Sequence, residues 1–390
     1  MVMAVTVPQA LAETLERLVA FDTVSARSNL ALVDYVEDLA RANGAETDRV
    51  PSETGDKAAL WITIGPRDVP GYVLSGHSDV VPVDGQAWSS DPFRLTLRDG
   101  RLYGRGTSDM KGFVAVCVAL MPEMAAARLR RPIHIALSYD EEVGCRGVRP
   151  LIARMRERGV RPLGCFVGEP TEMGVVLGHK GKCAARLTFR GRACHSALAP
   201  RGVNAVEFAA RFIDHVRLSA ERLAREGARD PLYDVPHTTG LCSVVGGGTA
   251  LNIVPDTCTV EFEYRAIAAD DAGGLVAAAT TYATEVLGAE MAARDPACGV
   301  TVEPLVDYPG LDLDPHADLA KLAKRLAGRD GHAKVSYGTE AGLFQTSGEV
   351  PAVVIGPGAM ARAHKADEYV MPDELETCAG FIRRLVAESC

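Results

Sequence analysis

Residues 132–169 read PIHIALSYDEEVGCRGVRPLIARMRERGVRPLGCFVGE, and they hold one complete unit of a parallel sheet. The apolar runs 132–139 and 164–169 predict two strands, and residues 146–159 between them carry the apolar spacing of a helix. A strand, a helix and a second strand in this order are typical of a parallel sheet covered by helices. Acidic residues follow or end both strands, so this unit also directs attention to the strand ends.

The same alternation continues on both sides of this unit. Helical spacing predicts helices at 8–21, 28–42, 110–129, 316–328 and 373–389. Apolar runs predict further strands at 59–65, 71–76 and 351–356. We therefore expect an α/β fold with a mostly parallel sheet flanked by helices.

The pattern changes between residues 182 and 308. There the order is strand, helix, strand, strand, helix, strand, over 183–191, 204–224, 238–247, 257–267, 271–287 and 299–306. This order is that of a ferredoxin-like α+β unit. We expect a first domain made of residues 1–181 and 309–390, into which a second domain, 182–308, is inserted.

Composition excludes several classes of protein. The 390 residues carry 42 Lys plus Arg against 51 Asp plus Glu, a net charge of −9, which argues against nucleic acid as a partner. The ten Cys are scattered without a CxxC pair, as in a reducing compartment. No run approaches the ~20 apolar residues of a membrane span, and the first residues lack the pattern of a signal peptide. We expect a soluble, cytoplasmic protein without a membrane partner.

Histidines and carboxylates follow the predicted strands or lie in the loops beside them. They are His77, Asp79, Asp109, Asp140, Glu141, Glu142, Glu169 and His364. Ligands bind at the carboxyl ends of strands in open α/β sheets. Imidazole nitrogens and carboxylate oxygens suit Zn²⁺ or a similar ion, and two ions bridged by a carboxylate form a hydrolytic site.

Each of these signals also has an ordinary explanation. His77 is equally typical of a histidine that only forms hydrogen bonds, and Asp109 is equally typical of the N-cap of the helix that follows it. The acids at 140–142 fit a solvated loop, Glu169 fits a turn beside Gly and Pro, and His364 fits a surface loop. The residues alone leave these alternatives open.

Taken in order, the motifs SGHSDVVPV, GRGTSDMKG, DEEVGC, GEPT and AHKADEYV resemble a known family. It is the family of co-catalytic dizinc amidohydrolases and peptidases, which contains N-acyl-amino-acid deacylases, desuccinylases and glutamate carboxypeptidases. The resemblance spans essentially the whole chain. It implies a zinc-peptidase-like catalytic domain with an inserted lid and dimerisation domain, and therefore a homodimer.

The resemblance also implies a set of metal ligands. His77, Asp109 and Glu169 would hold one metal, and Asp109, Glu142 and His364 would hold the other, so that Asp109 bridges the pair. The implied cofactor is Zn²⁺, two ions per subunit, and Co²⁺ suits the same ligands.

Three further residues receive catalytic roles from the resemblance. Glu141 would be the general base, and Asp79 would orient His77. His195 would reach the active site of the partner subunit and stabilise the oxyanion, although a structural His is the alternative. The family also implies a cis peptide bond between Asp109 and Met110.

Substrate contacts follow the same resemblance. Lys180 and Arg265 are candidate anchors for a carboxylate, and Asn252 matches a lid position that contacts substrate. Thr339 and Glu340 resemble the residues at the same positions of the family members that deacetylate ornithine derivatives. We hypothesise that Glu340 faces a substrate ammonium group, with a buried structural carboxylate as the alternative.

The resemblance thus implies hydrolysis of a small N-acyl amino acid, N2-acetyl-L-ornithine, to L-ornithine and acetate in arginine biosynthesis. Another deacylase, acting on acetylcitrulline or succinyl-diaminopimelate, and a dipeptidase are the alternatives within the family. A non-catalytic metal- or ligand-binding relative and a thiol hydrolase that uses Cys145 are alternatives from other classes.

Overall fold

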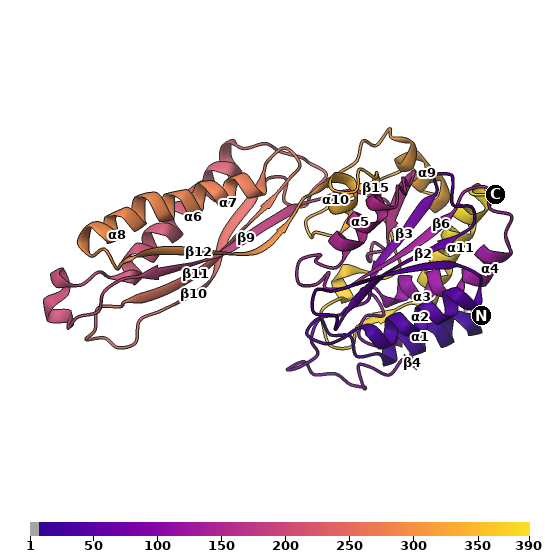
Figure 1. Ribbon diagram of the computed structural model, residues 1–390, viewed down its shortest axis with the longest axis horizontal. Coiled ribbons are helices and arrows are strands. Elements are labelled where there is room, and N and C mark those ends of the chain that lie inside the picture. The colour runs from indigo at the N-terminus through magenta and orange to yellow at the C-terminus, as the bar shows by residue number, and fades with distance from the viewer. Residues whose placement is uncertain (1–7) are drawn as a thin grey trace. The chain divides into compact units, whose positions relative to one another are not determined.

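The computed structural model describes residues 8–390 and divides them into two compact units (Figure 1). The first unit holds residues 8–178, 311–334 and 339–390. The second unit holds residues 179–310 and 335–338. Each unit has its own sheet and its own apolar core.

A nine-stranded sheet forms the centre of the first unit, in the order β1-β2-β6-β3-β7-β15-β8-β13, with β14 beside β8. The strands are β1 (Glu46–Pro51), β2 (Ala58–Ile64), β3 (Tyr72–His77), β6 (Ile133–Ser138), β7 (Gly164–Val167), β8 (Val176–His179), β13 (Leu311–Asp312), β14 (Ala333–Val335) and β15 (Ala352–Val354). The expected α/β class is confirmed. The sheet is mixed, however, because β6, β3, β7 and β15 pair parallel, whereas β1 with β2, β2 with β6 and β15 with β8 pair antiparallel. The short link between β1 and β2 permits only a hairpin.

Helices cover both faces of this sheet (Figure 1). They are α1 (Gln9–Ala20), α2 (Leu30–Ala42), α3 (Lys111–Ala119), α4 (Met121–Ala126), α5 (Val148–Glu157), α9 (Asp318–Ala327), α10 (Ala341–Thr346) and α11 (Pro372–Glu388). One apolar core joins α1, α2, α3, α4, α9 and α11, whereas α5 and α10 lie outside it on the other face. The single helix expected at 110–129 is divided at Leu120, because Pro122 starts a new helix in its first turn.

The parallel strands set the position of the polar residues that follow them. His77 ends β3 beside Ser138, which ends β6, and β7 runs parallel to β3 on its other side. Gly168 follows β7 where α3 packs closely, since a Cβ atom there would lie 2.0 Å from the ring of Phe113. The ends of three strands and the start of α3 therefore meet at one end of the sheet.

A small antiparallel sheet lies in the same unit. It contains β4 (Thr96–Arg98), β5 (Arg101–Tyr103) and β16 (Tyr369–Val370), none of which the sequence pattern predicted. Tyr103 pairs with Tyr369 across it. This pairing brings the loop after β5 next to the loop before β16. A short 3₁₀ turn, η3 (Met360–Arg362), precedes that second loop.

The second unit contains a four-stranded antiparallel sheet in the order β10-β11-β9-β12. Its elements are β9 (Gly181–Arg190), η1 (Ser196–Arg201), α6 (Ala205–Glu226), β10 (Thr239–Gly247), β11 (Thr257–Ala266), α7 (Ala272–Thr281), η2 (Tyr282–Gly288), α8 (Ala289–Arg294) and β12 (Gly299–Tyr308). This strand order is that of ferredoxin-like folds. The helices pack on the sheet around Phe212. Its ring meets that of Phe262 edge-on, with 5.0 Å between the two ring centroids.

The described residues contain no candidate for a membrane-spanning helix, because none of their helices is both long and apolar enough.

Candidate metal centre

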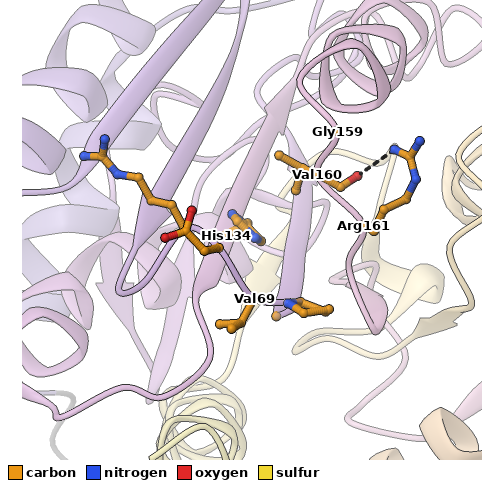
Figure 2. Close-up of a pocket in the computed structure, with 9 residues that line it drawn as sticks. Val69, His134, Gly159, Val160 and Arg161 are labelled. Atoms are coloured by element: carbon orange, nitrogen blue, oxygen red, sulfur yellow. Dashed lines mark hydrogen bonds between the residues drawn. The ribbon is translucent and has the colours of Figure 1, made fainter.

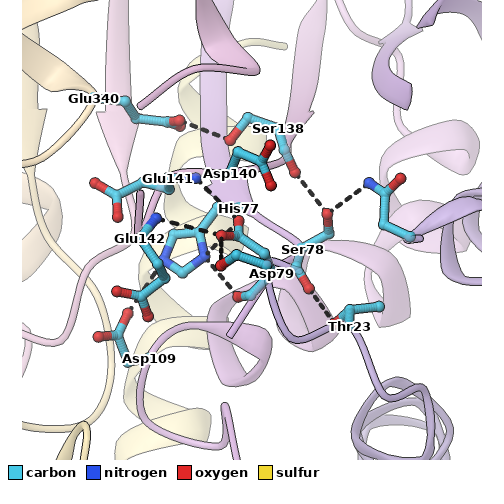
Figure 3. Close-up of polar contacts among 12 residues, drawn as sticks. Thr23, His77, Ser78, Asp79, Asp109, Ser138, Asp140, Glu141, Glu142 and Glu340 are labelled. Atoms are coloured by element: carbon cyan, nitrogen blue, oxygen red, sulfur yellow. Dashed lines mark hydrogen bonds and ion pairs between the residues drawn. The ribbon is translucent and has the colours of Figure 1, made fainter. Parts of the chain in front are cut away.

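His77 and Asp79 form the first part of the centre, at the end of β3 (Figure 3). The Nδ1 atom of His77 lies 2.9 Å from the carbonyl oxygen of Asp79 and 3.5 Å from its Oδ1 atom. Nδ1 can therefore donate a hydrogen bond, which leaves the lone pair of Nε2 for a metal ion. Both side chains are buried, so the ring orientation is fixed by these contacts.

Asp79 also holds the acidic loop that follows β6. Its Oδ1 atom accepts a hydrogen bond from the main-chain N–H of Glu141 at 3.1 Å, and its Oδ2 atom accepts one from that of Glu142 at 3.3 Å. The hydroxyl of Ser25 donates to Oδ2 at 2.7 Å. Asp79 thus orients the ring of His77 and also fixes the main chain of Glu141 and Glu142.

Asp109 lies between two imidazole rings. Its Oδ1 atom is 3.2 Å from Nε2 of His77, and its Oδ2 atom is 3.1 Å from Nε2 of His364. The same nitrogen of His364 is 3.1 Å from Oε2 of Glu142, and Oε1 of Glu169 is 3.7 Å from Nε2 of His77. The structure thus brings together the five residues that the resemblance names as ligands, with Asp109 shared between two groups.

Glu141 lies beside this pair of groups. Ligand atoms of His77, Glu141 and Glu169 lie within 4.8 Å of one another, and so do those of His77, Asp109 and Glu142. The thiol of Cys145 is 3.2 Å from Oε1 of Glu141. The peptide bond between Asp109 and Met110 is cis, as the resemblance implied.

Burial and mutual repulsion disturb the ionisation of these groups. Burial, with nearby carboxylates, raises the pKa of Glu141 to about 8 and that of Glu142 to about 7, and it holds the pKa of Glu169 well above its usual range. The pKa of Asp109 is lowered, because its contacts with the histidines outweigh the effect of burial. Hydrogen bonds to Asp109 and Glu142 raise the pKa of His364 to about 10.

These residues fit a divalent cation. The Oε1 atom of Glu142 is buried and has no hydrogen-bond partner among the described residues, which is rare for a buried oxygen. A cation beside it would supply that partner and would neutralise the crowded carboxylates. Two histidines with three carboxylates are the donors that zinc and similar ions prefer.

Comparison with known proteins agrees with the geometry. The model of peptidase family M20/M25/M40 matches residues 73–388. The chain belongs to this family. The resemblance seen in the motifs is therefore confirmed.

Curated relatives cover nearly the whole chain. The acetylornithine deacetylase of Myxococcus xanthus is 34% identical over 387 residues, which are 98% of each chain. The acetylornithine deacetylase of Edwardsiella ictaluri is 31% identical over 376 residues, 95% of this chain and 93% of the other.

Solved structures share the fold. An aminopeptidase PepT from Bacillus cereus has a TM-score of 0.76 at 19% identity, covering 98% of this chain and 99% of the other. A metallo-carboxypeptidase of the M20 family from Sulfolobus solfataricus has a TM-score of 0.76 at 17% identity, covering 97% and 99%. At these identities the likeness supports the M20 fold alone.

Thr339 and Glu340 immediately precede α10, and Figure 3 shows Glu340 beside Ser138. Glu340 is fully buried. Its Oε1 atom accepts a hydrogen bond from Ser75 at 2.5 Å, and its Oε2 atom accepts one from Ser138 at 2.8 Å. Thr339 is also buried, and its hydroxyl oxygen accepts a hydrogen bond from the N–H of Ala341 at 3.0 Å. This placement favours the alternative of a buried structural carboxylate for Glu340.

Lys180 and Arg265 lie in the second unit and have partners there. The Nζ atom of Lys180 donates to the carbonyl oxygen of His237 at 2.6 Å, and burial lowers its pKa. The Nε atom of Arg265 donates to Oε1 of Glu263 at 2.8 Å. Their role as carboxylate anchors stays a prediction.

His195 and Asn252 lie on neighbouring exposed segments of the same unit. His195 forms a bridge with Ile253. The N–H of Ser196 donates to the carbonyl oxygen of Asn252 at 2.9 Å. The second unit therefore brings these two predicted residues together, although they are far apart in the sequence.

A cavity of about 250 Å³ lies elsewhere in the first unit (Figure 2). Its lining includes Gly71, His134 and Arg161. Gly71 and Arg161 precede β3 and β7, and His134 lies near the start of β6. The cavity is thus at the amino ends of the parallel strands, whereas His77 is at their carboxyl end. It contains none of the predicted ligands.

Sequence reasoning missed residues that support the acidic loop. Lys57 contacts Asp140 at 2.6 Å and also donates to the carbonyl oxygen of Ser25. Asp140 itself has a positive φ of 54°, a conformation uncommon outside glycine. Ser25 and Lys57 stand outside the motifs quoted above, so no local signal could have identified them.

We expect binding of Zn²⁺ to the metal-free protein at pH 7 to release protons. Without a cation, the pKa of His364 is about 10, so its ring is protonated at pH 7. The pKa of Glu142 is about 7, so this carboxyl is about half protonated, and a metal must displace both kinds of proton. The release should reach at least about one proton, and the affinity should rise with pH above 7. Calorimetry in buffers of different ionisation enthalpy measures the number.

His364→Ala should release fewer protons in the same titration. Binding enthalpies that are equal in every buffer would show that the groups are already deprotonated.

Proposed function

We propose that this chain is a metal-dependent amidohydrolase that converts N2-acetyl-L-ornithine and water to L-ornithine and acetate. The observation that carries the proposal is the position of Asp109, which turns one oxygen to His77 and the other to His364. A carboxylate shared in this way is what a pair of cations requires. The acetylornithine deacetylases that match over nearly the whole chain support the choice of substrate.

The proposed cofactor is a pair of Zn²⁺ ions, for which Co²⁺ could substitute. His77, Asp109 and Glu169 would hold one, and Asp109, Glu142 and His364 the other. When bound, the ions would polarise the amide carbonyl and lower the pKa of water towards ~7. The residues supply the geometry for this chemistry, because Asp79 fixes the ring of His77 and the main chain of Glu142.

Glu141 is the proposed general base. Its carboxylate takes a proton from the attacking water and later gives a proton to the leaving amine, so the amide C–N bond breaks and a carboxylate and an amine remain. Burial raises its pKa to about 8 when no cation is present, and nearby positive charge favours its ionised form.

Glu141→Gln should lower kcat by roughly 10²- to 10⁴-fold, because the amide cannot accept the proton. KM and metal content should stay close to those of the wild type. Steady-state kinetics and elemental analysis of the same preparations check both.

Cys145→Ala is the control for this prediction. Burial holds the pKa of the Cys145 thiol well above its usual range, so a thiolate mechanism is disfavoured. We expect this variant to keep most of its activity, and chelation to abolish activity until metal is restored. Activity that survives chelation but is lost in Cys145→Ala would favour the thiol hydrolase instead.

A panel of acetylornithine, acetylcitrulline, acetylmethionine and succinyl-diaminopimelate tests the substrate. We expect the highest kcat/KM for acetylornithine. A higher value for one of the others would assign the chain to another deacylase, and activity on dipeptides alone would assign it to the dipeptidases.

Glu340→Gln should keep the preference of the wild type for acetylornithine over acetylmethionine. Both carboxylate oxygens already accept hydrogen bonds from serines, and the side chain is fully buried. A large fall in this preference would restore the hypothesis that Glu340 faces the substrate ammonium.

We further propose a homodimer formed through the second unit, acting in the cytoplasm. Strand β10 is an edge of the four-stranded sheet, and it exposes Leu241, Val244 and Val245 by 48%, 51% and 54%. An apolar edge of this kind is available for pairing with another chain. His195 would then act in the site of the partner subunit, where its imidazole would stabilise the oxyanion.

Mixing two inactive variants tests both parts of this proposal. His195→Ala and Glu141→Gln should each be nearly inactive as homodimers. After their subunits exchange, mixed dimers would contain one intact site, so roughly a quarter of wild-type activity should return. No recovery despite confirmed exchange would place His195 in its own subunit's site, and a fully active His195→Ala homodimer would place it outside catalysis. A monomer in sedimentation equilibrium would exclude the dimer.

A further inference from the structure

A buried ion pair lies beside the metal centre. Arg105 and Glu368 are each 1% exposed, and an Nη atom of Arg105 lies 2.6 Å from Oε2 of Glu368. The two residues are 263 positions apart in the sequence. Burying two charges is costly, and such a pair often adds little to stability by itself. Both side chains also bind main-chain groups of neighbouring loops.

Glu368 fixes the main chain of the shared ligand. Its Oε1 atom accepts hydrogen bonds from the N–H groups of Ser108 at 2.9 Å and Asp109 at 3.0 Å. Its other oxygen is the one that binds Arg105. Both carboxylate oxygens are thus occupied, and the backbone that carries Asp109 is tied to the loop before β16.

Arg105 holds that loop from the other side. Its guanidinium donates to the carbonyl oxygens of Lys365 at 3.2 Å and Pro82 at 3.4 Å, and to the side-chain oxygen of Gln86. The amide nitrogen of Gln86 donates in turn to the carbonyl oxygen of His364 at 3.3 Å. The main chain of His364 is therefore restrained through this network.

This restraint helps to explain the backbone conformation of His364. Its φ is 61°, in the left-handed region that residues other than glycine seldom adopt. Such a conformation persists only where the surroundings enforce it. The hydrogen bond from Gln86 and the contact of Arg105 with the next residue, Lys365, supply part of that enforcement.

We propose that Arg105 and Glu368 form a positioning clamp, which sets Asp109 and His364 at the distance that the second metal site needs. The inference rests on the two-cation centre proposed above. Neither clamp residue is a ligand. The clamp joins two loops that the main sheet does not order, so that their ligands are in place before a cation binds.

The decisive measurement is the affinity of the metal-free protein for Zn²⁺, taken by competition with a chromophoric chelator. The wild type should bind two equivalents with two resolvable dissociation constants. Glu368→Gln should weaken the second equivalent by roughly 10- to 100-fold and the first equivalent less, since His77 and Glu169 are held by other contacts.

Glu37→Gln is the matched control. Glu37 is also buried and pairs with Arg41 and Arg49, but none of these residues contacts a predicted ligand. The substitution removes the same charge from a buried glutamate, although the arginines that pair with Glu37 are more exposed than Arg105. Both dissociation constants should equal those of the wild type, whereas thermal unfolding of the metal-free protein should show a loss of stability.

The outcomes separate the clamp from the proposed function. A wild type that binds fewer than two equivalents overturns both. A wild type that binds two, together with unchanged affinities in Glu368→Gln, overturns the clamp alone. Equal weakening in Glu37→Gln also overturns it, because the effect would then follow from stability in general.

Gln86→Ala decides the matter if Glu368→Gln does not fold. Gln86 is partly exposed and uncharged, so its removal leaves the contact between Arg105 and Glu368 in place. It releases the carbonyl of His364, together with one N–H of Arg105 and the indole N–H of Trp88. The second Zn²⁺ equivalent should weaken in the same direction by a smaller factor. An unchanged second equivalent in this variant would overturn the proposed link from Arg105 to His364.

Discussion

The centre depends on one carboxylate held between two imidazole rings. Asp109 can present a different oxygen to His77 and to His364 only if its own main chain is fixed, and Glu368 accepts hydrogen bonds from that main chain. Burial and the repulsion between neighbouring carboxylates both raise the pKa of Glu142 when no cation is present. The surrounding hydrogen bonds therefore hold an arrangement that its own charges oppose.

Two different parts of the first unit supply this arrangement. The parallel strands β3, β6 and β7 end together, and they deliver His77, the acidic loop and Glu169. The loops beside the small sheet of β4, β5 and β16 deliver Asp109 and His364. Asp79 orders the ligands of the main sheet, whereas the buried pair of Arg105 and Glu368 orders those of the loops. The catalytic geometry thus depends on both sheets.

The structure defines the metal-binding residues more completely than it defines the residues that select the substrate. The predicted ligands converge within hydrogen-bonding or near-contact distances. The predicted substrate contacts are already engaged otherwise, since Glu340 binds two serines, Lys180 binds a main-chain carbonyl and Arg265 pairs with Glu263. This difference between ligands and substrate contacts is consistent with a family that shares one reaction but varies in substrate. Binding contacts can change without altering the reaction.

The sequence by itself determined the α/β class, the ferredoxin-like strand order and the residue types at the strand ends. These features follow from hydrophobic periodicity and from preferences between residues that are neighbours in the sequence, and both are local. It did not reveal the antiparallel edges of the main sheet or the small sheet around β5. Only the tertiary structure decided that Glu340 is buried against Ser75 and Ser138 and that Arg105 meets Glu368. Contacts between residues 263 positions apart depend on how finished elements pack, and no local pattern records that packing.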